Sequence, residues 1–392
     1  MLRKGPAIAA ATVALALWSG LAVWWSEGKL EERVLRSAAG LISAQANEKK
    51  VRYPLALLAH NAAMEPLNQR RLNQYIVGAV REGRLKGASL DKAMAQLAKL
   101  GWRDTPSLQN QILFHGSRGE IGLTLDNVDA LLRREKLGDD VLAAMSMAET
   151  DPAFRKVLIE RLRAEASWTS RFLQFSALLK RPENIAARAL TMRALVDAKV
   201  PLSRMDVAPS LLHMVAAGNR VEAYAIWEKW RGAPARAPRG FDHDFRLTAQ
   251  LSAEERDVPV PFEWMLASGP GYRGYIDGSD VGASLSIRWD GRGTPYFVQR
   301  IFRAPEGGWG LRVNGLDLTP ASIRDLRFLV ACPTGEPIDM VVRIAESKQG
   351  LLLVPEKPVG CAYPGLVIRG QAREAGLGPR EWIINDISLE RS

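Results

Sequence analysis

Gly-Ala-Pro-Ala-Arg-Ala-Pro-Arg-Gly at residues 232–240 separates two parts of a 392-residue chain that differ in hydrophobic pattern. Before this stretch, apolar residues recur about every three or four positions, as on one face of an α-helix. After it, apolar and polar residues alternate, as in a β-strand. Because proline and glycine at this density are typical of a connection, the sequence predicts helical repeats at 29–231, a linker at 232–240 and a β-domain at 241–392.

The helical region has the signals of a series of short helical hairpins. Leu90, Met94 and Leu97 share one face of a predicted helix. Asp151 followed by Pro152 is a typical helix start, in which a capping residue precedes proline at the first helical position. About ten or eleven such helices fit into the region, and their short connections require antiparallel neighbours. This pattern predicts an α-solenoid, whose curved surface is suited to docking a partner protein.

Two stretches of this region resemble a known family. Residues 99–106 (Lys-Leu-Gly-Trp-Arg-Asp-Thr-Pro) and 129–134 (Asp-Ala-Leu-Leu-Arg-Arg) are similar to degenerate tetratricopeptide-type proteins of alphaproteobacteria. The resemblance implies a membrane-proximal helix, a divergent repeat array and a β-rich C-terminal part, with some members among envelope-polysaccharide functions. The usual Trp-Leu-Gly-Tyr core of the repeat is not recoverable here, so the repeat count stays open.

Residues 1–28 are predicted to form a cytoplasmic tip and a transmembrane anchor. Positions 6–25 carry no charge, and a helix of this length spans roughly the 30 Å of a bilayer's hydrocarbon core. Arg3 and Lys4 precede it, so the positive-inside rule predicts a bacterial inner-membrane protein with its body in the periplasm. A cleaved signal peptide, with a possible cleavage site at 20–22, is the alternative, and it would export the body as well.

The net charge of +10 is concentrated in the helical part of the chain. Residues 27–240 hold 34 Lys and Arg against 23 Asp and Glu, a balance of +11, whereas residues 241–392 hold 17 against 20, a balance of −3. Outside a membrane the polyanions available to a basic surface are lipid head groups and acidic polysaccharides, so nucleic acid is not an expected partner. The alternative is an ordinary solvated surface with arginine on the outer sides of the helices.

The C-terminal part is predicted to be an antiparallel β-sandwich of jelly-roll type. Leu285, Ile287 and Trp289 alternate with polar neighbours, and residues 326–332 and 338–344 repeat this alternation. About eight or nine short strands fit into the domain, as expected for two packed sheets. The chain as a whole is therefore predicted to contain a transmembrane helix, a tetratricopeptide-like solenoid and a β-sandwich.

Aromatic residues of the β-domain are candidates for ligand binding, because sugar rings stack on exposed aromatic faces. Tyr275 is the first candidate, since it lies on the opposite side of its strand from Ile276. Trp309, beside a glycine-rich loop, is the second candidate, and Trp264 is an ambiguous third. Trp289 shares a face with apolar residues and is assigned to the core. Ordinary surface or edge-strand aromatic residues remain the alternative for the candidates.

The chain has two cysteines, Cys332 and Cys361. In an oxidising compartment they are expected to form a disulfide that ties two strand ends together. Two buried free thiols are the alternative. A pair of cysteines without a further pair or a histidine at ligand spacing does not predict a zinc site, and no metal or cofactor is expected.

Two apparent chemical motifs do not have the context that their chemistry needs. Residues 269–274 (Gly-Pro-Gly-Tyr-Arg-Gly) match the glycine pattern of dinucleotide-binding loops, but strand-like sequence follows where that loop requires a helix. Asp242-His243-Asp244 resembles a metal-ligand set, yet in an extended segment the two carboxylates and the imidazole face opposite ways. No hydrolase or nucleotide-binding signature is found in the sequence, although a carboxylate pair for glycoside cleavage has no recognisable motif.

The leading functional hypothesis is a non-enzymatic periplasmic scaffold whose helical repeats dock a cell-envelope protein. The alternative is a binding module for envelope or exported polysaccharide, acting through the β-domain. A carbohydrate-active enzyme of the envelope is the third possibility.

Overall fold

The computed structural model describes residues 54–134, 138–236, 240–278, 282–316, 318–343, 350–371 and 379–391. The predicted membrane anchor at 6–25 lies outside these residues. Within them, no helix combines the length and the apolar character that crossing a bilayer demands. The chain forms two compact units, residues 1–198 and 199–392, which are described separately below.

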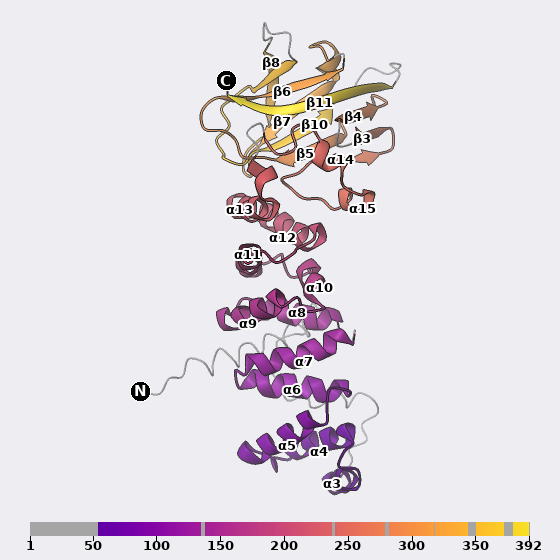
Figure 1. The fold of residues 1–392 in the computed structure, drawn as a ribbon, viewed down its shortest axis with the longest axis vertical. Coiled ribbons are helices and arrows are strands. Elements are labelled where there is room, and N and C mark those ends of the chain that lie inside the picture. The colour runs from indigo at the N-terminus through magenta and orange to yellow at the C-terminus, as the bar shows by residue number, and fades with distance from the viewer. Residues whose placement is uncertain are drawn as a thin grey trace, which may run out of the picture. The chain divides into compact units, whose positions relative to one another are not determined.

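The first unit is helical in its described residues. Its helices are α3 (Leu55–Met64), α4 (Gln69–Arg81), α5 (Gly87–Lys99), α6 (Thr105–Ser117), α7 (Ile121–Arg133), α8 (Gly138–Ala148), α9 (Pro152–Arg163), α10 (Thr169–Gln174) and α11 (Pro182–Asp197) (Figure 1). Successive helices from α3 to α8 pack together, and α4, α7 and α9 also contact α6, α9 and α11 respectively. The helices α4, α6, α8 and α10 begin 36, 33 and 31 residues apart, so the unit repeats a helical hairpin at uneven intervals.

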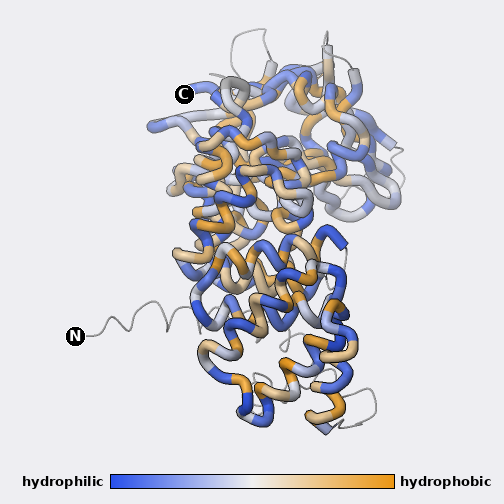
Figure 2. Tube along the Cα trace, turned by 60° about the horizontal axis from the view of Figure 1, so that its bottom comes forward, coloured by the Kyte–Doolittle hydropathy of each residue, from blue (hydrophilic) through white to orange (hydrophobic). Residues whose placement is uncertain are grey.

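Local signals explain where these helices begin and which faces they bury. The side chain of Asp151 accepts a hydrogen bond from the Phe154 backbone N–H at 2.8 Å and caps α9, which confirms the predicted start. Met94 and Leu97 of α5 are buried, as their spacing predicted, and Gly101 follows the end of α5 with a φ of +95°. Figure 2 shows apolar and polar residues alternating along these helices, as amphipathic helices require.

A buried ion pair joins three helices of the first unit. Arg188 on α11 donates from Nε to both carboxylate oxygens of Glu149, at 3.1 and 3.0 Å. Its other nitrogens donate to the carbonyls of Phe172 and Leu173 and to the hydroxyl of Ser146. The guanidinium carbon also lies 4.3 Å from the centre of the Phe172 ring. Both charges are therefore buried with a nearly complete set of partners.

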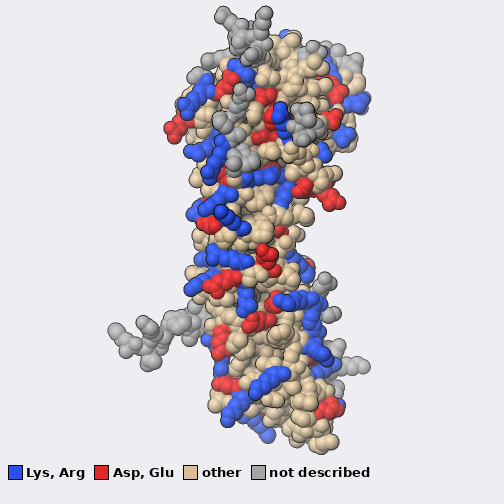
Figure 3. Space-filling model, viewed as in Figure 1, with Lys and Arg blue, Asp and Glu red and all other residues tan. Residues whose placement is uncertain are grey.

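Exposed ion pairs connect neighbouring hairpins on the surface of this unit. Asp126 pairs with Arg161 at 2.6 Å, and Asp139 pairs with Arg171 at 3.3 Å. Figure 3 shows Lys and Arg side chains interspersed with Asp and Glu side chains on the helical part of the chain. Each exposed pair is expected to contribute only about 0–1 kcal/mol to the free energy of unfolding. These pairs therefore add little to the stability of the unit.

The second unit combines helices with an antiparallel sheet. Its helices are α12 (Arg204–Ala216), α13 (Arg220–Arg231), α14 (Arg246–Ala249) and α15 (Ala253–Arg256), with short 3₁₀ helices at Ala233–Arg236 and Ser322–Asp325. Its strands are β1 (Met265–Leu266), β2 (Ser268–Gly269), β3 (Tyr272–Gly278), β4 (Ala283–Trp289), β5 (Tyr296–Ile301), β6 (Trp309–Leu316), β7 (Leu326–Ala331), β8 (Ile338–Arg343), β9 (Leu351–Pro355), β10 (Gly365–Gly370) and β11 (Arg380–Arg391). The unit begins before α12, so two helices that the sequence analysis placed in the repeats belong with the sheet.

The strands form one sheet that nearly closes into a barrel, rather than the two sheets of the predicted jelly-roll sandwich. Their order is β1-β5-β10-β7-β8-β9-β6-β11-β4-β3-β2, and every pairing is antiparallel. β8 pairs with both β7 and β9, which joins the two halves. The two ends of the sheet meet at Ala267, whose N–H donates to the carbonyl of Phe297 while its carbonyl accepts from Gly274. The sandwich prediction was wrong because alternation identifies the inner face of a strand but not its partners.

The inside of the barrel is filled by apolar side chains. Trp289 is fully buried there together with Leu285 and Ile287, as predicted. Residues 269–274, which match the dinucleotide-loop pattern, form the hairpin between β2 and β3. Gly271 takes a φ of +80° in its turn, directly after Pro270. The glycine pattern therefore belongs to a tight turn of the sheet.

Candidate functional site

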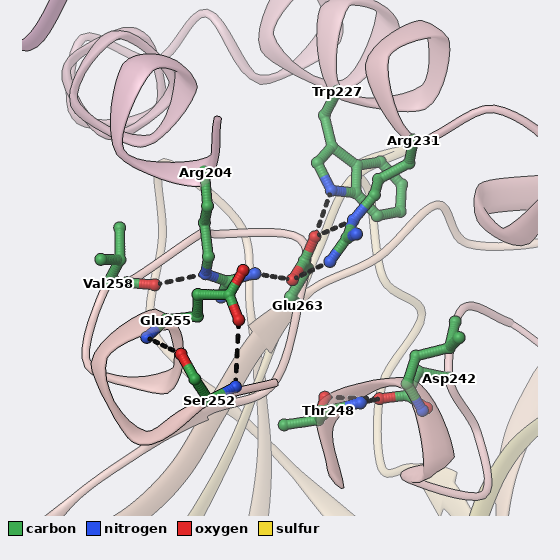
Figure 4. A network of polar contacts seen from close by, with 10 residues as sticks. Arg204, Trp227, Arg231, Asp242, Thr248, Ser252, Glu255, Val258 and Glu263 are labelled. Atoms are coloured by element: carbon green, nitrogen blue, oxygen red, sulfur yellow. Dashed lines mark hydrogen bonds and ion pairs between the residues drawn. The ribbon is translucent and has the colours of Figure 1, made fainter. Parts of the chain in front are cut away.

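Glu263, in the segment before β1, is a buried carboxylate that ties α12 and α13 to the β-domain (Figure 4). Its side chain is 1% exposed. Arg231 donates to it from Nε at 2.6 Å and from Nη2 at 2.9 Å, and Trp227 donates from Nε1 at 3.2 Å. Arg204 donates to the same carboxylate and, from Nε, to the carbonyl of Val258 at 2.9 Å. Burial alone would raise the pKa of Glu263, but the hydrogen bonds and charges of the two arginines hold it below the usual value.

Aromatic rings, among them that of Trp227, continue the contact between α13 and the β-domain. The Tyr224 ring centre lies 5.3 Å from that of Phe262 and 4.9 Å from that of Tyr363. Trp227 lies 5.4 Å from Phe262 and 5.0 Å from Phe241. Ring pairs at these separations stabilise the fold beyond the effect of burying their surface. We therefore expect these rings to form a wall with a fixed shape.

A pocket of about 640 Å³ opens beside this wall of rings. Tyr224, Phe241 and Tyr363 line it together with Arg300 of β5. Its volume is in the range of small-molecule sites. The charged residues of the lining are Arg236, Arg300, Arg303, Arg391, Glu228, Glu306 and Glu390. Tyr363 is partly exposed in this lining, whereas Tyr224 and Phe241 are buried. The pocket can therefore offer one ring and several charged hydrogen-bonding groups to a ligand.

The disulfide holds the edge of this pocket in place. Cys332 directly follows β7, Cys361 precedes β10, and their Cα atoms are 5.9 Å apart in the bonded pair, as usual for a disulfide. Arg220 of α13 donates to the carbonyl of Tyr363 at 2.7 Å and to that of Ala331 at 3.3 Å, next to the two cysteines. The disulfide and Arg220 thus fix the backbone that carries the Tyr363 ring.

Replacing both Cys332 and Cys361 by serine is expected to lower the free energy of unfolding of the second unit by about 3.6 kcal/mol. This is the loop-entropy effect for two cysteines 29 positions apart. Urea denaturation of the variant and the oxidised parent measures the difference. The parent reduced with dithiothreitol is the control and is expected to lose the same amount. Equal stability of oxidised and reduced parent would contradict the prediction.

The three aromatic ligand candidates do not come together in one site. Tyr275 is partly exposed on β3, where its hydroxyl donates to Glu381 at 2.9 Å and Arg273 lies over its ring at 4.8 Å. Trp309 is buried, contrary to the expectation of an exposed ring, because it starts β6 facing the interior. Trp264 is also buried, and its Nε1 donates to the carbonyl of Asp242 at 2.7 Å.

The side chains of Asp242-His243-Asp244 have three separate sets of partners. The carboxylate of Asp242 accepts hydrogen bonds from the backbone N–H groups of Leu247 and Thr248, at 2.7 and 2.9 Å (Figure 4). His243 lies 3.6 Å from the carboxylate of Asp386. Asp244 pairs with Arg246 at 3.1 Å. Among the residues that the structure describes, no group of three potential metal ligands is found.

Sequence reasoning missed Glu263 and Arg300, the charges on which the site depends. Both stand in apolar surroundings, in Val260-Pro261-Phe262-Glu263-Trp264 and in Phe297-Val298-Gln299-Arg300-Ile301-Phe302. A charge inside such a run is the signal that could have found them, because a buried charge needs a partner.

Comparison of the sequence with models of known protein families gives no match. A comparison with curated proteins gives no match either. The residues of the pocket are therefore the basis for a functional proposal.

Proposed function

We propose that this chain is a non-enzymatic binding protein of the bacterial cell envelope, and that its second unit binds a saccharide in the pocket beside α13. The observation that carries the proposal is the combination of the partly exposed Tyr363 ring with charged groups around one pocket of about 640 Å³. Sugars offer C–H faces for the rings and hydroxyls for the charged groups.

The envelope location is part of this proposal and has two supports. The disulfide between the chain's two cysteines favours an oxidising compartment such as the periplasm. The uncharged segment at 6–25 favours an inner-membrane anchor that keeps the body there. In this proposal the hairpins of the first unit are degenerate tetratricopeptide-type repeats, since their starts, 31 to 36 residues apart, bracket the roughly 34-residue period of that repeat.

Replacing Tyr363 by alanine is expected to weaken saccharide binding about tenfold, because it removes a ring from the pocket wall. Isothermal titration of the full-length chain with oligosaccharides, acidic and neutral, measures the change. Tyr275→Ala is the matched control, because Tyr275 lies on β3 outside the pocket lining. An effect of Tyr275→Ala without one of Tyr363→Ala would move the proposed site to β3.

A scaffold that docks a protein through its helical unit is the second candidate function. Its support is the exposure of large apolar side chains there, above all Trp102, which is 60% exposed after α5. Exposed tryptophan is enriched at the centres of protein interfaces. Under this alternative, partner binding responds to substitution of Trp102 and is unaffected by Tyr363→Ala.

A further inference from the structure

Arg300 is the one buried arginine of the described residues that lacks a buried carboxylate as its ion-pair partner. Arg188 and Arg204 pair with Glu149 and Glu263, respectively. Arg300 is 6% exposed, and in the described part of the chain no carboxylate forms an ion pair with it. Its Nε also has no hydrogen-bond partner there. Within the described residues, Arg300 is therefore a buried cation that no carboxylate contacts directly, although the charges of Asp242 and Glu263 act on it.

The surroundings of Arg300 keep its guanidinium charged and in one orientation. The guanidinium carbon lies 4.8 Å from the centre of the Trp264 ring and 5.6 Å from that of Phe241. Burial lowers the pKa of Arg300 to about 10, partly offset by the charge of Asp242, so the group is cationic at neutral pH. A buried cation without a partner destabilises a folded protein, which is expected where the partner is a ligand.

We propose that the pocket binds an acidic saccharide and that Arg300 pairs with the carboxylate of a uronic acid residue. This inference rests on the proposed saccharide-binding function and names the class of saccharide. A guanidinium presents a planar fork of donors that matches a carboxylate in two parallel hydrogen bonds. One carboxylate of the ligand supplies the direct ion-pair partner that Arg300 lacks in the described part of the chain.

The other charges of the pocket favour a singly charged sugar acid over a phosphate. Glu228 and Glu306 line the same pocket as Arg300, and they repel a dianion more strongly than a monoanion. Their oxygens can instead accept hydrogen bonds from saccharide hydroxyls. Arg303 and Arg391 are exposed members of the same lining and are placed to meet further acidic residues of a chain.

The test compares the binding of tetragalacturonate with that of a neutral galactose tetrasaccharide, by isothermal titration of the full-length chain. Tetragalacturonate is expected to bind more tightly, and Arg300→Gln is expected to weaken its binding about tenfold or more. Arg300→Lys is expected to restore only part of the loss, since lysine lacks the planar fork. Arg292→Gln is the matched control, because Arg292 is 92% exposed and outside the pocket lining.

A stability measurement separates a ligand-binding arginine from a structural one. Arg300→Gln is expected to melt at the same temperature as the parent or higher, because it removes a buried charge that has no direct ion-pair partner. A large loss of stability would overturn the assignment. Equal binding of both tetrasaccharides, unaffected by Arg300→Gln, would leave the saccharide proposal standing and overturn the acidic one. Binding of neither overturns both, and displacement of tetragalacturonate by millimolar inorganic phosphate overturns the preference for a carboxylate.

Discussion

Replacing Glu263 by glutamine is expected to lower the free energy of unfolding of the second unit by about 3–5 kcal/mol. The substitution removes one side of a buried ion pair and leaves Arg204 and Arg231 facing each other without a counter-charge. Urea denaturation followed by tryptophan fluorescence measures the loss, because Trp227 contacts the same carboxylate. Hydrogen exchange at the α13 amides is expected to speed up in the variant, since that helix loses one of its connections to the β-domain.

Lowering the pH provides a second measure of the contribution of Glu263 to the free energy of unfolding. The pKa of Glu263 is held below its ordinary value of 4.5, so its stabilising contribution is complete above about pH 4.5 and is lost as the pH falls through the lowered value. The difference between parent and Glu263→Gln is therefore expected to shrink in acid. Glu254→Gln, at an exposed position on α15, is the matched control and is expected to change stability by less than about 0.5 kcal/mol. A difference that is constant down to pH 2 would refute this account.

Replacing Arg188 by methionine is expected to destabilise the first unit by about 3–5 kcal/mol, because Glu149 is then buried without its partner. Circular dichroism at 222 nm during urea denaturation measures the loss of this helical unit. The double variant Glu149→Leu, Arg188→Met is expected to recover a large part of the stability, since apolar residues often replace a buried ion pair without loss.

An exposed ion pair of the same unit is the control for this prediction. Arg161→Met removes the partner of Asp126, and both side chains are more than a third exposed. Its expected cost is below about 1 kcal/mol. If the double variant is no more stable than Arg188→Met, then the contacts of Arg188 to the Phe172 and Leu173 carbonyls, rather than the charge of Glu149, account for the effect.

Local structure could be predicted from the sequence where one residue and its near neighbours decide it. The cap of α9 at Asp151 depends on a residue three positions away, and the inner face of β4 follows from alternation through Trp289. Pairing between strands depends on distant residues instead. Trp309 looked exposed beside its loop, yet β6 has β9 and β11 on its two sides and turns that ring inward.

The candidate site could not be predicted from the sequence, because it also depends on contacts between distant residues. Arg204 and Arg231 are 59 and 32 positions from Glu263, so no local spacing relates the three. Arg300 lies in β5 beside the buried Phe297, Val298 and Ile301, and its significance depends on which carboxylates the fold brings near it. The assignment of α13 to the sheet follows from these contacts, because an amphipathic helix pattern does not identify the surface against which the helix packs.

The closure of the sheet at Ala267 affects the tendency of this protein to aggregate at high concentration. An open sheet presents a row of free backbone donors and acceptors along each outer strand, and a second molecule can pair with that row. Here the outer strands, β1 and β2, have two residues each and are consecutive in the chain. Such short edges give an incoming strand almost no backbone to pair with. Strand addition, the usual first step of β-aggregation, therefore has to wait for the barrel to open.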